Sequence, residues 1–234
     1  QRGLITYVMA LMNGARVGIA AQSLGIAEAA YRLARIYAHS RQQFGVPIEQ
    51  MPAVAEMVTD MQIAIEAART LTYETARVCD LENNNLRILE YSQHLPADKR
   101  KQRKQQSRSY KRINAMLTPM SKYYASEMCN SVAYDTIQVL GGSGYMKDYA
   151  AERFMRDARI TTIGGGTSDI QREIIGRLLL KCTALRSIVP PPRAGNRRKT
   201  EEVRRMKRWQ EFARAAPELA EAGRELIYQS GTPL

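Results

Sequence analysis

The sequence lacks any uninterrupted apolar run long enough to cross a bilayer, which takes about 20 helical residues. Its first residues also lack the pattern and cleavage site of a signal peptide. The chain begins with Gln1 rather than Met, which favours a fragment or a processed chain. We therefore expect a protein without a membrane span, located in the cytoplasm.

Cysteine and histidine are scarce, with three and two residues in a chain of 234. The cysteines, Cys79, Cys129 and Cys182, are odd in number and far apart, so no disulfide framework is indicated. The two histidines do not stand at the spacing of metal ligands. We expect no metal site and a reducing compartment.

Acidic residues are missing from one strongly basic stretch, Lys99–Arg112, which holds eight Lys or Arg residues. A second segment, 186–208, holds nine basic and two acidic residues. Because the whole chain carries a net charge of +12, the remainder is slightly acidic. Charge runs of this kind are most often solvated. Nucleic acid is therefore not the expected partner, although a basic adaptor that binds nucleic acid or an anionic surface stays an alternative.

Strand-type alternation is absent, and apolar residues recur at helical spacing through most of the chain. This spacing predicts helices over residues 1–43, 52–81, 115–140 and 151–157, and another that begins at Ser168 with Gln171 at the capping-box distance. The asparagines before residue 86 predict a turn or a frayed helix end, and residues 86–113 are expected to form a basic helical insertion. We expect an all-α, antiparallel four-helix-bundle-like domain over 1–185, a linker over 186–200 and a helical tail over 201–234.

Three motifs point to one family: SRQQFG from Ser40, IQVLGGSGYMKDYAAERFMRDARIT from Ile137, and GGGTSDIQRE from Gly164. Over about residues 4–183 the chain resembles the C-terminal, FAD-associated half of an acyl-CoA dehydrogenase. Its basic insertion resembles the large bacterial long-chain-type branch. The resemblance implies an FAD flavoprotein of fatty acid metabolism that oxidises an acyl-CoA thioester and forms a homo-oligomer, a dimer or a tetramer. The N-terminal half of such an enzyme has no counterpart in this sequence.

The resemblance also implies residues that bind FAD. They are Arg41, Gln43, Phe44, Gln138, Gly141, Gly142, Thr167 and Asp169. Arg41 would supply a cation to the FAD pyrophosphate of a neighbouring subunit. Taken alone, some of these positions also have a simpler structural interpretation: Arg41 suits a helix C-terminus, Gly141 and Gly142 suit a helix stop, and Asp169 suits the first turn of a helix.

The catalytic base of the family is a glutamate, usually within Tyr-Glu-Gly-Thr. Here the matching residues are Gly164, Gly165, Gly166 and Thr167, so Gly165 stands at the base position without a side chain. Gly166 would lie near the thioester of the substrate.

Some members place the glutamate instead directly before the residue that matches Arg16, and that position is Ala15 here. Arg16 is retained, and in the family it supports the base.

The glycines allow several interpretations. They predict a flexible turn before a capped helix, or a widened pocket without proton abstraction, or a site in which Glu28, Glu56, Glu66 or an acid outside this chain serves as base. The leading function is the C-terminal domain of an FAD-dependent acyl-CoA dehydrogenase. A non-catalytic flavoprotein subunit or scaffold that pairs with a complete partner is the alternative.

Overall fold

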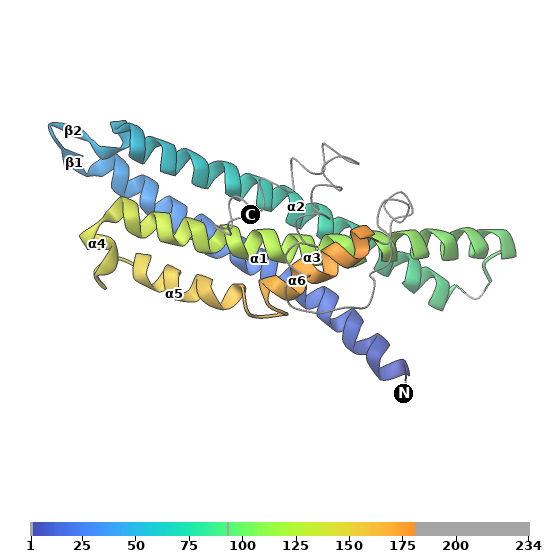
Figure 1. Cartoon of the computed structure of the whole chain (residues 1–234). Helices are drawn as coiled ribbons and strands as arrows, with labels where there is room; N and C mark the ends of the chain where they lie inside the picture. The colour runs from blue at the N-terminus through green and yellow to red at the C-terminus, as the bar shows by residue number, and fades with distance from the viewer. Residues whose placement is uncertain (1, 93, 181–234) are drawn as a thin grey trace. The chain divides into compact units, whose positions relative to one another are not determined.

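The computed structural model describes residues 2–92 and 94–180 (Figure 1). Three long helices, α1 (Arg2–Ser40), α2 (Pro52–Tyr91) and α3 (Ala97–Leu140), are followed by the shorter α4 (Gly142–Tyr145), α5 (Ala151–Thr161) and α6 (Ser168–Leu180). The packing described below is that of the compact unit Gln1–Arg172. The predicted linker and tail, and Cys182, lie outside the described residues. No described helix is apolar over a length that would span a membrane.

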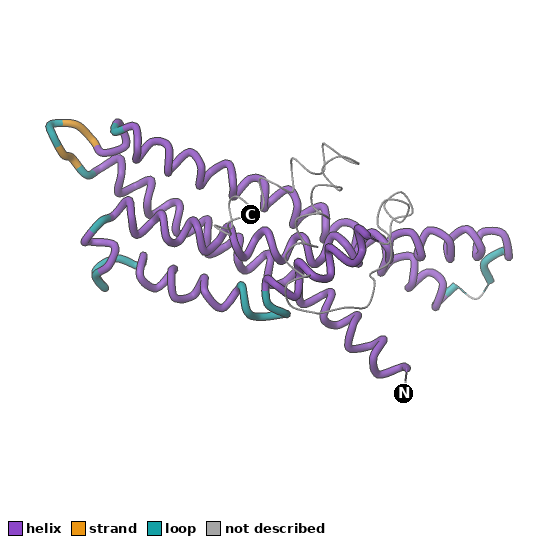
Figure 2. The backbone as a smooth tube through the Cα atoms, viewed as in Figure 1, coloured by secondary structure: helices purple, strands orange, loops and turns teal. Residues whose placement is uncertain are grey.

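The all-α class is confirmed, and consecutive long helices run in opposite directions (Figure 1). Figure 2 shows one exception to the helices, a pair of two-residue strands, β1 (Gln42–Gln43) and β2 (Val46–Pro47), between α1 and the 3-10 turn η1 (Ile48–Gln50). The sequence did not predict this pair, because two residues are too few to show alternation.

Small residues let α1 and α3 approach closely. Ala27, Ala30 and Ala34 of α1 are fully buried, as are Ala125 and Cys129 of α3. Their spacing of three, four or seven residues puts them on one side of each helix. Larger apolar side chains from α2, such as those of Met61 and Ile65, complete this core.

The predicted turn before residue 86 is wrong, because α2 continues through the asparagines to Tyr91. Asn85 is buried, donates to the carbonyl of Leu81 at 3.0 Å and accepts from Arg103 Nη1 at 2.8 Å. Asn114 of α3 donates to Glu82 Oε2 at 2.6 Å. The contact from Arg103 of α3, together with the bond to Leu81, occupies the side-chain amide of Asn85, which would otherwise compete with the helix backbone. The basic insertion is therefore helical, as predicted, but it forms the paired ends of α2 and α3.

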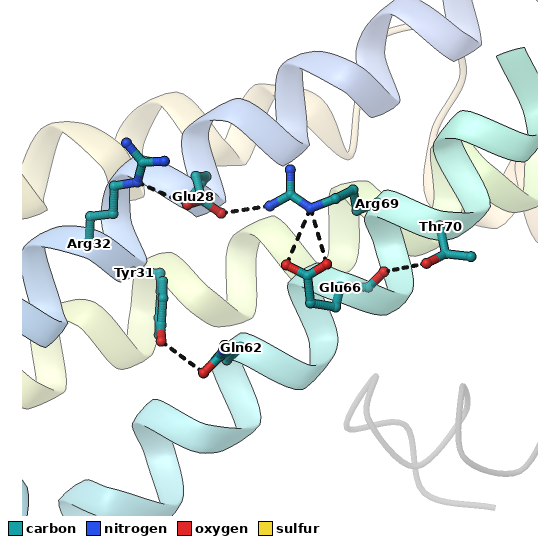
Figure 3. Close-up of polar contacts among 7 residues, drawn as sticks. All are labelled: Glu28, Tyr31, Arg32, Gln62, Glu66, Arg69 and Thr70. Carbon is teal, nitrogen blue, oxygen red and sulfur yellow. Dashed lines mark hydrogen bonds and ion pairs between the residues drawn. The ribbon is translucent and has the colours of Figure 1, made fainter.

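An ion-pair network joins α1 to α2 (Figure 3). Glu28 accepts from Arg32 at 2.9 Å and from Arg69 at 2.8 Å, and Arg69 also contacts Glu66 at 3.2 Å. In Figure 3 the guanidinium of Arg69 lies between the two carboxylates. Two of the acids considered above as substitute bases are thus engaged in this network, Glu28 through a pair between α1 and α2 and Glu66 through a pair within α2.

Candidate functional site around the glycine turn

The SRQQFG motif forms the end of α1 and the small hairpin after it. Phe44 and Gly45 have positive φ values of 53° and 83°, which turn the chain between β1 and β2. The side chains of Arg41 and Gln43 are exposed, and 94% of Phe44 is exposed. A cation, an amide and an aromatic ring therefore stand free on one hairpin, where a ligand or a second chain could contact them.

The second motif leaves bare backbone between α3 and α4. Gly141 has φ 59°, a conformation that favours glycine, and a Cβ added to Gly141 or Gly142 would meet nothing within 4 Å. Gln138 is exposed one turn earlier. Gly144 differs, because a Cβ there would lie 2.8 Å from the carbonyl oxygen of Ile137. Gly144 is thus a packing glycine, whereas its neighbours leave the surface open.

The glycine turn joins α5 to α6. Gly165 and Gly166 have φ values of 67° and 101°, so both adopt backbone conformations that other residues rarely take. The turn is closed by a hydrogen bond from the amide of Ser168 to the carbonyl of Thr162, 3.1 Å long. A Cβ added to Gly165 would lie 2.6 Å from Cδ1 of Ile19 on α1. The place of a side chain at position 165 is therefore taken by Ile19.

The predicted capping box is wrong, because Thr167 rather than Ser168 caps α6. The Thr167 hydroxyl accepts from the amide of Ile170 at 3.4 Å. The Ser168 hydroxyl instead donates to Glu127, and Gln171 donates to the carbonyls of Gly165 and Gly166 at 3.2 and 3.0 Å. Because Glu127 of α3 and the carbonyls of the turn take up the side chains of Ser168 and Gln171, these two residues do not form the capping box.

The surface of the first turn of α6 is open. Thr167 is exposed, and the Asp169 side chain is 90% exposed, with Arg172 at 3.6 Å. Ile170 is 51% exposed, and the first turn of α6 is held through Ser168 and Gln171 instead. The exposed Thr167 hydroxyl at a helix N-terminus suits a polar or anionic ligand.

Two buried cations lie behind the turn. Arg16 is 3% exposed, donates from Nη1 to Asn13 at 2.9 Å, and its buried Nε has no hydrogen-bond partner among the described residues. Burial lowers the pKa of this guanidinium. Lys122 of α3 is fully buried and donates from Nζ to the Thr162 carbonyl at 3.1 Å. Ala15, next to Arg16, is exposed and provides no acid.

The environment of Lys122 disfavours its charge. Burial lowers its pKa to about 8; the nearby Glu127 opposes this shift, and Arg16 adds to it. Sequence reasoning missed both Lys122 and Glu127. A signal existed for the lysine, since residues 118, 122, 125, 129 and 132 follow helical spacing and all five are buried.

No acid considered from the sequence reaches the turn. Glu28 and Glu66 lie in the α1–α2 network of Figure 3, and Glu56 is exposed on α2. The acid that the structure brings to the turn is Glu127, which is half-buried and accepts from Ser168. It holds the inner side of the turn, beside Lys122.

Comparison with known proteins gives consistent matches. The family model described as "Acyl-CoA dehydrogenase, C-terminal domain" matches residues 2–93 and 97–180. An acyl-CoA dehydrogenase of Bacillus subtilis is 41% identical over 172 residues, which are 74% of this chain and 38% of that protein. The CarC subunit of the caffeyl-CoA reductase-Etf complex of Acetobacterium woodii is 36% identical over 173 residues, with the same coverage of both chains.

The fold has similar relatives among solved structures. Butyryl-CoA dehydrogenase from Megasphaera elsdenii superposes with a TM-score of 0.57 at 32% identity, over 74% of this chain and 38% of that chain. The chain thus spans a little over a third of the length of the relatives it matches. These relatives do not distinguish a long-chain-type branch, which stays a prediction.

Proposed function

The chain belongs to the acyl-CoA dehydrogenase family, and from that premise we propose that it supplies the C-terminal part of an FAD site that acts on an acyl-CoA. In the family, this site catalyses α,β-dehydrogenation of the thioester, a reaction that needs a base to remove the α-proton. FAD, when bound, supplies the hydride acceptor. This chain provides part of the cofactor bed, and a homo-oligomer together with the N-terminal half provides the rest.

Three exposed features fit FAD. Arg41 offers a guanidinium for a pyrophosphate, and the ring of Phe44 stands beside it on the same hairpin. Gly141 and Gly142 offer backbone that a flat group can approach, since no side chain of their own covers it. Thr167 stands at the N-terminus of α6, where polar groups of a cofactor are stabilised. Gln43, Gln138 and Asp169 are exposed close to these features in sequence.

We further propose that the chain contributes to binding FAD and an acyl-CoA but supplies no base to remove the α-proton of the acyl group. The observation that carries this proposal is Gly165, which has no side chain, has φ 67°, and has Ile19 Cδ1 at 2.6 Å from where a Cβ would stand. A general base must reach within about 3 Å of the proton it removes. Neither Gly165 nor Ala15 can do so.

The test supplies the N-terminal half of the enzyme that this chain lacks. The chain is combined with the N-terminal half of a close relative, and flavin bleaching by an acyl-CoA is followed anaerobically in a single turnover. We expect slow bleaching with the natural chain. The triple variant Gly164→Tyr, Gly165→Glu, Ile19→Val should bleach faster by about 10²–10⁴-fold, the usual contribution of a positioned general base. Ile19→Val is included because it removes Cδ1.

The matched control carries Gln instead of Glu at position 165, with the same two companion changes. It keeps the shape of the site but has no base, so it should bleach as slowly as the natural chain. Fast bleaching by the natural chain would mean that another acid serves as base, and the proposal of a base-free site would be wrong.

A second candidate is a non-catalytic subunit that pairs with a complete flavoprotein. Its support is that one relative, CarC, is by name a subunit of a complex. The same restored protein separates the two candidates. A non-catalytic subunit would retain FAD and acyl-CoA binding yet stay slow after the base is restored.

A further inference from the structure

We propose that α3 fixes the glycine turn in place, with Lys122 and Glu127 as positioning residues at its two ends. Lys122 binds the first residue of the turn, the carbonyl of Thr162, at 3.1 Å. Glu127 accepts from the hydroxyl of Ser168, where the turn ends and α6 begins. The inference deepens the proposed function, because the turn would carry the base position.

The contacts from α3 extend to both sides of the turn. Asn130 Nδ2 donates to the carbonyl of Ala158, in the last turn of α5, at 2.9 Å. Tyr123 accepts from Arg172 Nε, in the first turn of α6, at 2.8 Å, and the guanidinium lies 5.0 Å from the centre of its ring. One side of a single helix therefore binds the chain before, within and after the turn.

The turn itself is closed around the point that Lys122 contacts. The Thr162 carbonyl accepts from both Lys122 Nζ and the amide of Ser168. Gln171, fully buried, donates to the carbonyls of Gly165 and Gly166 from the inner side. The positive φ values of the glycines thus coexist with four hydrogen bonds that restrict the turn, which argues against the interpretation of a flexible turn.

Burying a lysine costs free energy, because its ammonium group loses its hydration. The charged groups that act on Lys122 are Glu127 on its own helix and Arg16 on α1. Only one of these two is acidic. An apolar side chain would pack there without losing hydration. The ammonium group, bonded to the Thr162 carbonyl, therefore points to a role in holding the turn rather than in packing alone.

Hydrogen exchange of the full chain, without cofactor or substrate, tests the inference. The variants are Lys122→Met, which keeps the volume, and Ser168→Ala, which releases the other end. We expect the backbone amides of residues 164 and 168 to exchange about 10- to 100-fold faster in each variant, since a hydrogen bond to a charged group is lost. Amides of α2 should be unchanged.

Two controls separate positioning from a general loss of stability. Lys111→Met changes an exposed lysine of the same helix and should leave the turn unaffected. Ser168→Thr keeps a hydroxyl for Glu127 and should restore protection. If Lys122→Met fails to fold, the serine variants still decide the question. Unchanged exchange of the turn in Ser168→Ala would overturn the inference.

A kinetic measurement adds the functional consequence. In the restored triple variant, Ser168→Ala should lower the bleaching rate at saturating acyl-CoA by about 10-fold, because a small misplacement of a base is costly. The acyl-CoA concentration for half-maximal rate should not change. If the triple variant itself is inactive, the proposed function fails, whereas the exchange experiment still decides whether α3 holds the turn.

Discussion

The buried ammonium group of Lys122 should make the stability of the protein depend on alkaline pH. Its pKa is lowered from 10.5 to about 8 in the folded chain, mainly by burial. Between these two pH values the unfolded chain binds more protons at this residue than the folded chain. The free energy of unfolding therefore rises with pH through this window.

The size of the effect follows from the pKa shift. Each pKa unit corresponds to about 1.4 kcal/mol, so a shift of this size gives about 3 kcal/mol between pH 8 and pH 10.5. Below pH 8 both states are protonated, and the folded protein carries the full cost of burying the charge. For a chain of this size the whole effect equals about 6–12 °C in Tm.

The assay compares the natural chain with Lys122→Met by urea unfolding, followed by circular dichroism, at pH 7, 8, 9 and 10. The variant loses the bond to Thr162, but that carbonyl still accepts from the amide of Ser168, so no buried group is left unpaired. We expect the variant to be at least as stable as the natural chain at pH 7. Above pH 8, the free energy of unfolding of the natural chain should then rise steadily relative to that of the variant.

Taking the difference between the two proteins removes the titration of every other group. Lys111→Met again serves as control, because an exposed lysine should not change the slope. If the natural chain and Lys122→Met show parallel stability from pH 8 to pH 10, Lys122 titrates normally and the reasoning about its burial is wrong.

Three further predictions concern a buried thiol and two glycines. Burial raises the pKa of the Cys129 thiol from 9.0 to about 12. The folded state therefore keeps its proton longer than the unfolded state, and stability should fall as pH rises from 9 toward 12. Cys129→Ala should remove that fall in the same urea assay. Gly18→Ala should raise the free energy of unfolding by up to about 1 kcal/mol, and Tm with it, since the residue is helical and an added Cβ meets nothing within 4 Å. Gly166→Ala should instead lower Tm, because its φ is 101° and a Cβ would lie 2.7 Å from a side-chain amide.

The sequence was sufficient to predict the fold class because apolar residues recur at helical spacing along the buried side of each long helix. Met61, Ala68 and Val78 of α2 recur at helical intervals, and all three are buried. The end of α2 was not predictable in this way. Asparagine favours turns when it lacks partners, and the partner of Asn85 is Arg103, which lies 18 residues further along the chain.

The candidate site likewise contains residues that the sequence located and residues that it missed. The motifs locate Gly165 and Arg16, because a missing or retained side chain is visible in the sequence. Lys122 and Glu127 were missed, since their function depends on which carbonyl and hydroxyl of a distant turn lie beside them. A sequence shows a lysine at a buried helical position, but it does not show what that lysine binds.

The structure also changes what the empty base position means. A glutamate at Gly165 would have to adopt φ near 67°, at about 1–2 kcal/mol for a residue with a Cβ. It would also have to displace Cδ1 of Ile19, which occupies the same space. Loss of the base is therefore accompanied by a turn conformation and a neighbour that suit glycine. The first obstacle acts on both variants, whereas Ile19→Val in the triple variant removes the second, so Gly165→Glu alone should recover less bleaching activity than the triple variant. Equal recovery by the two would show that Ile19 adjusts freely to a side chain.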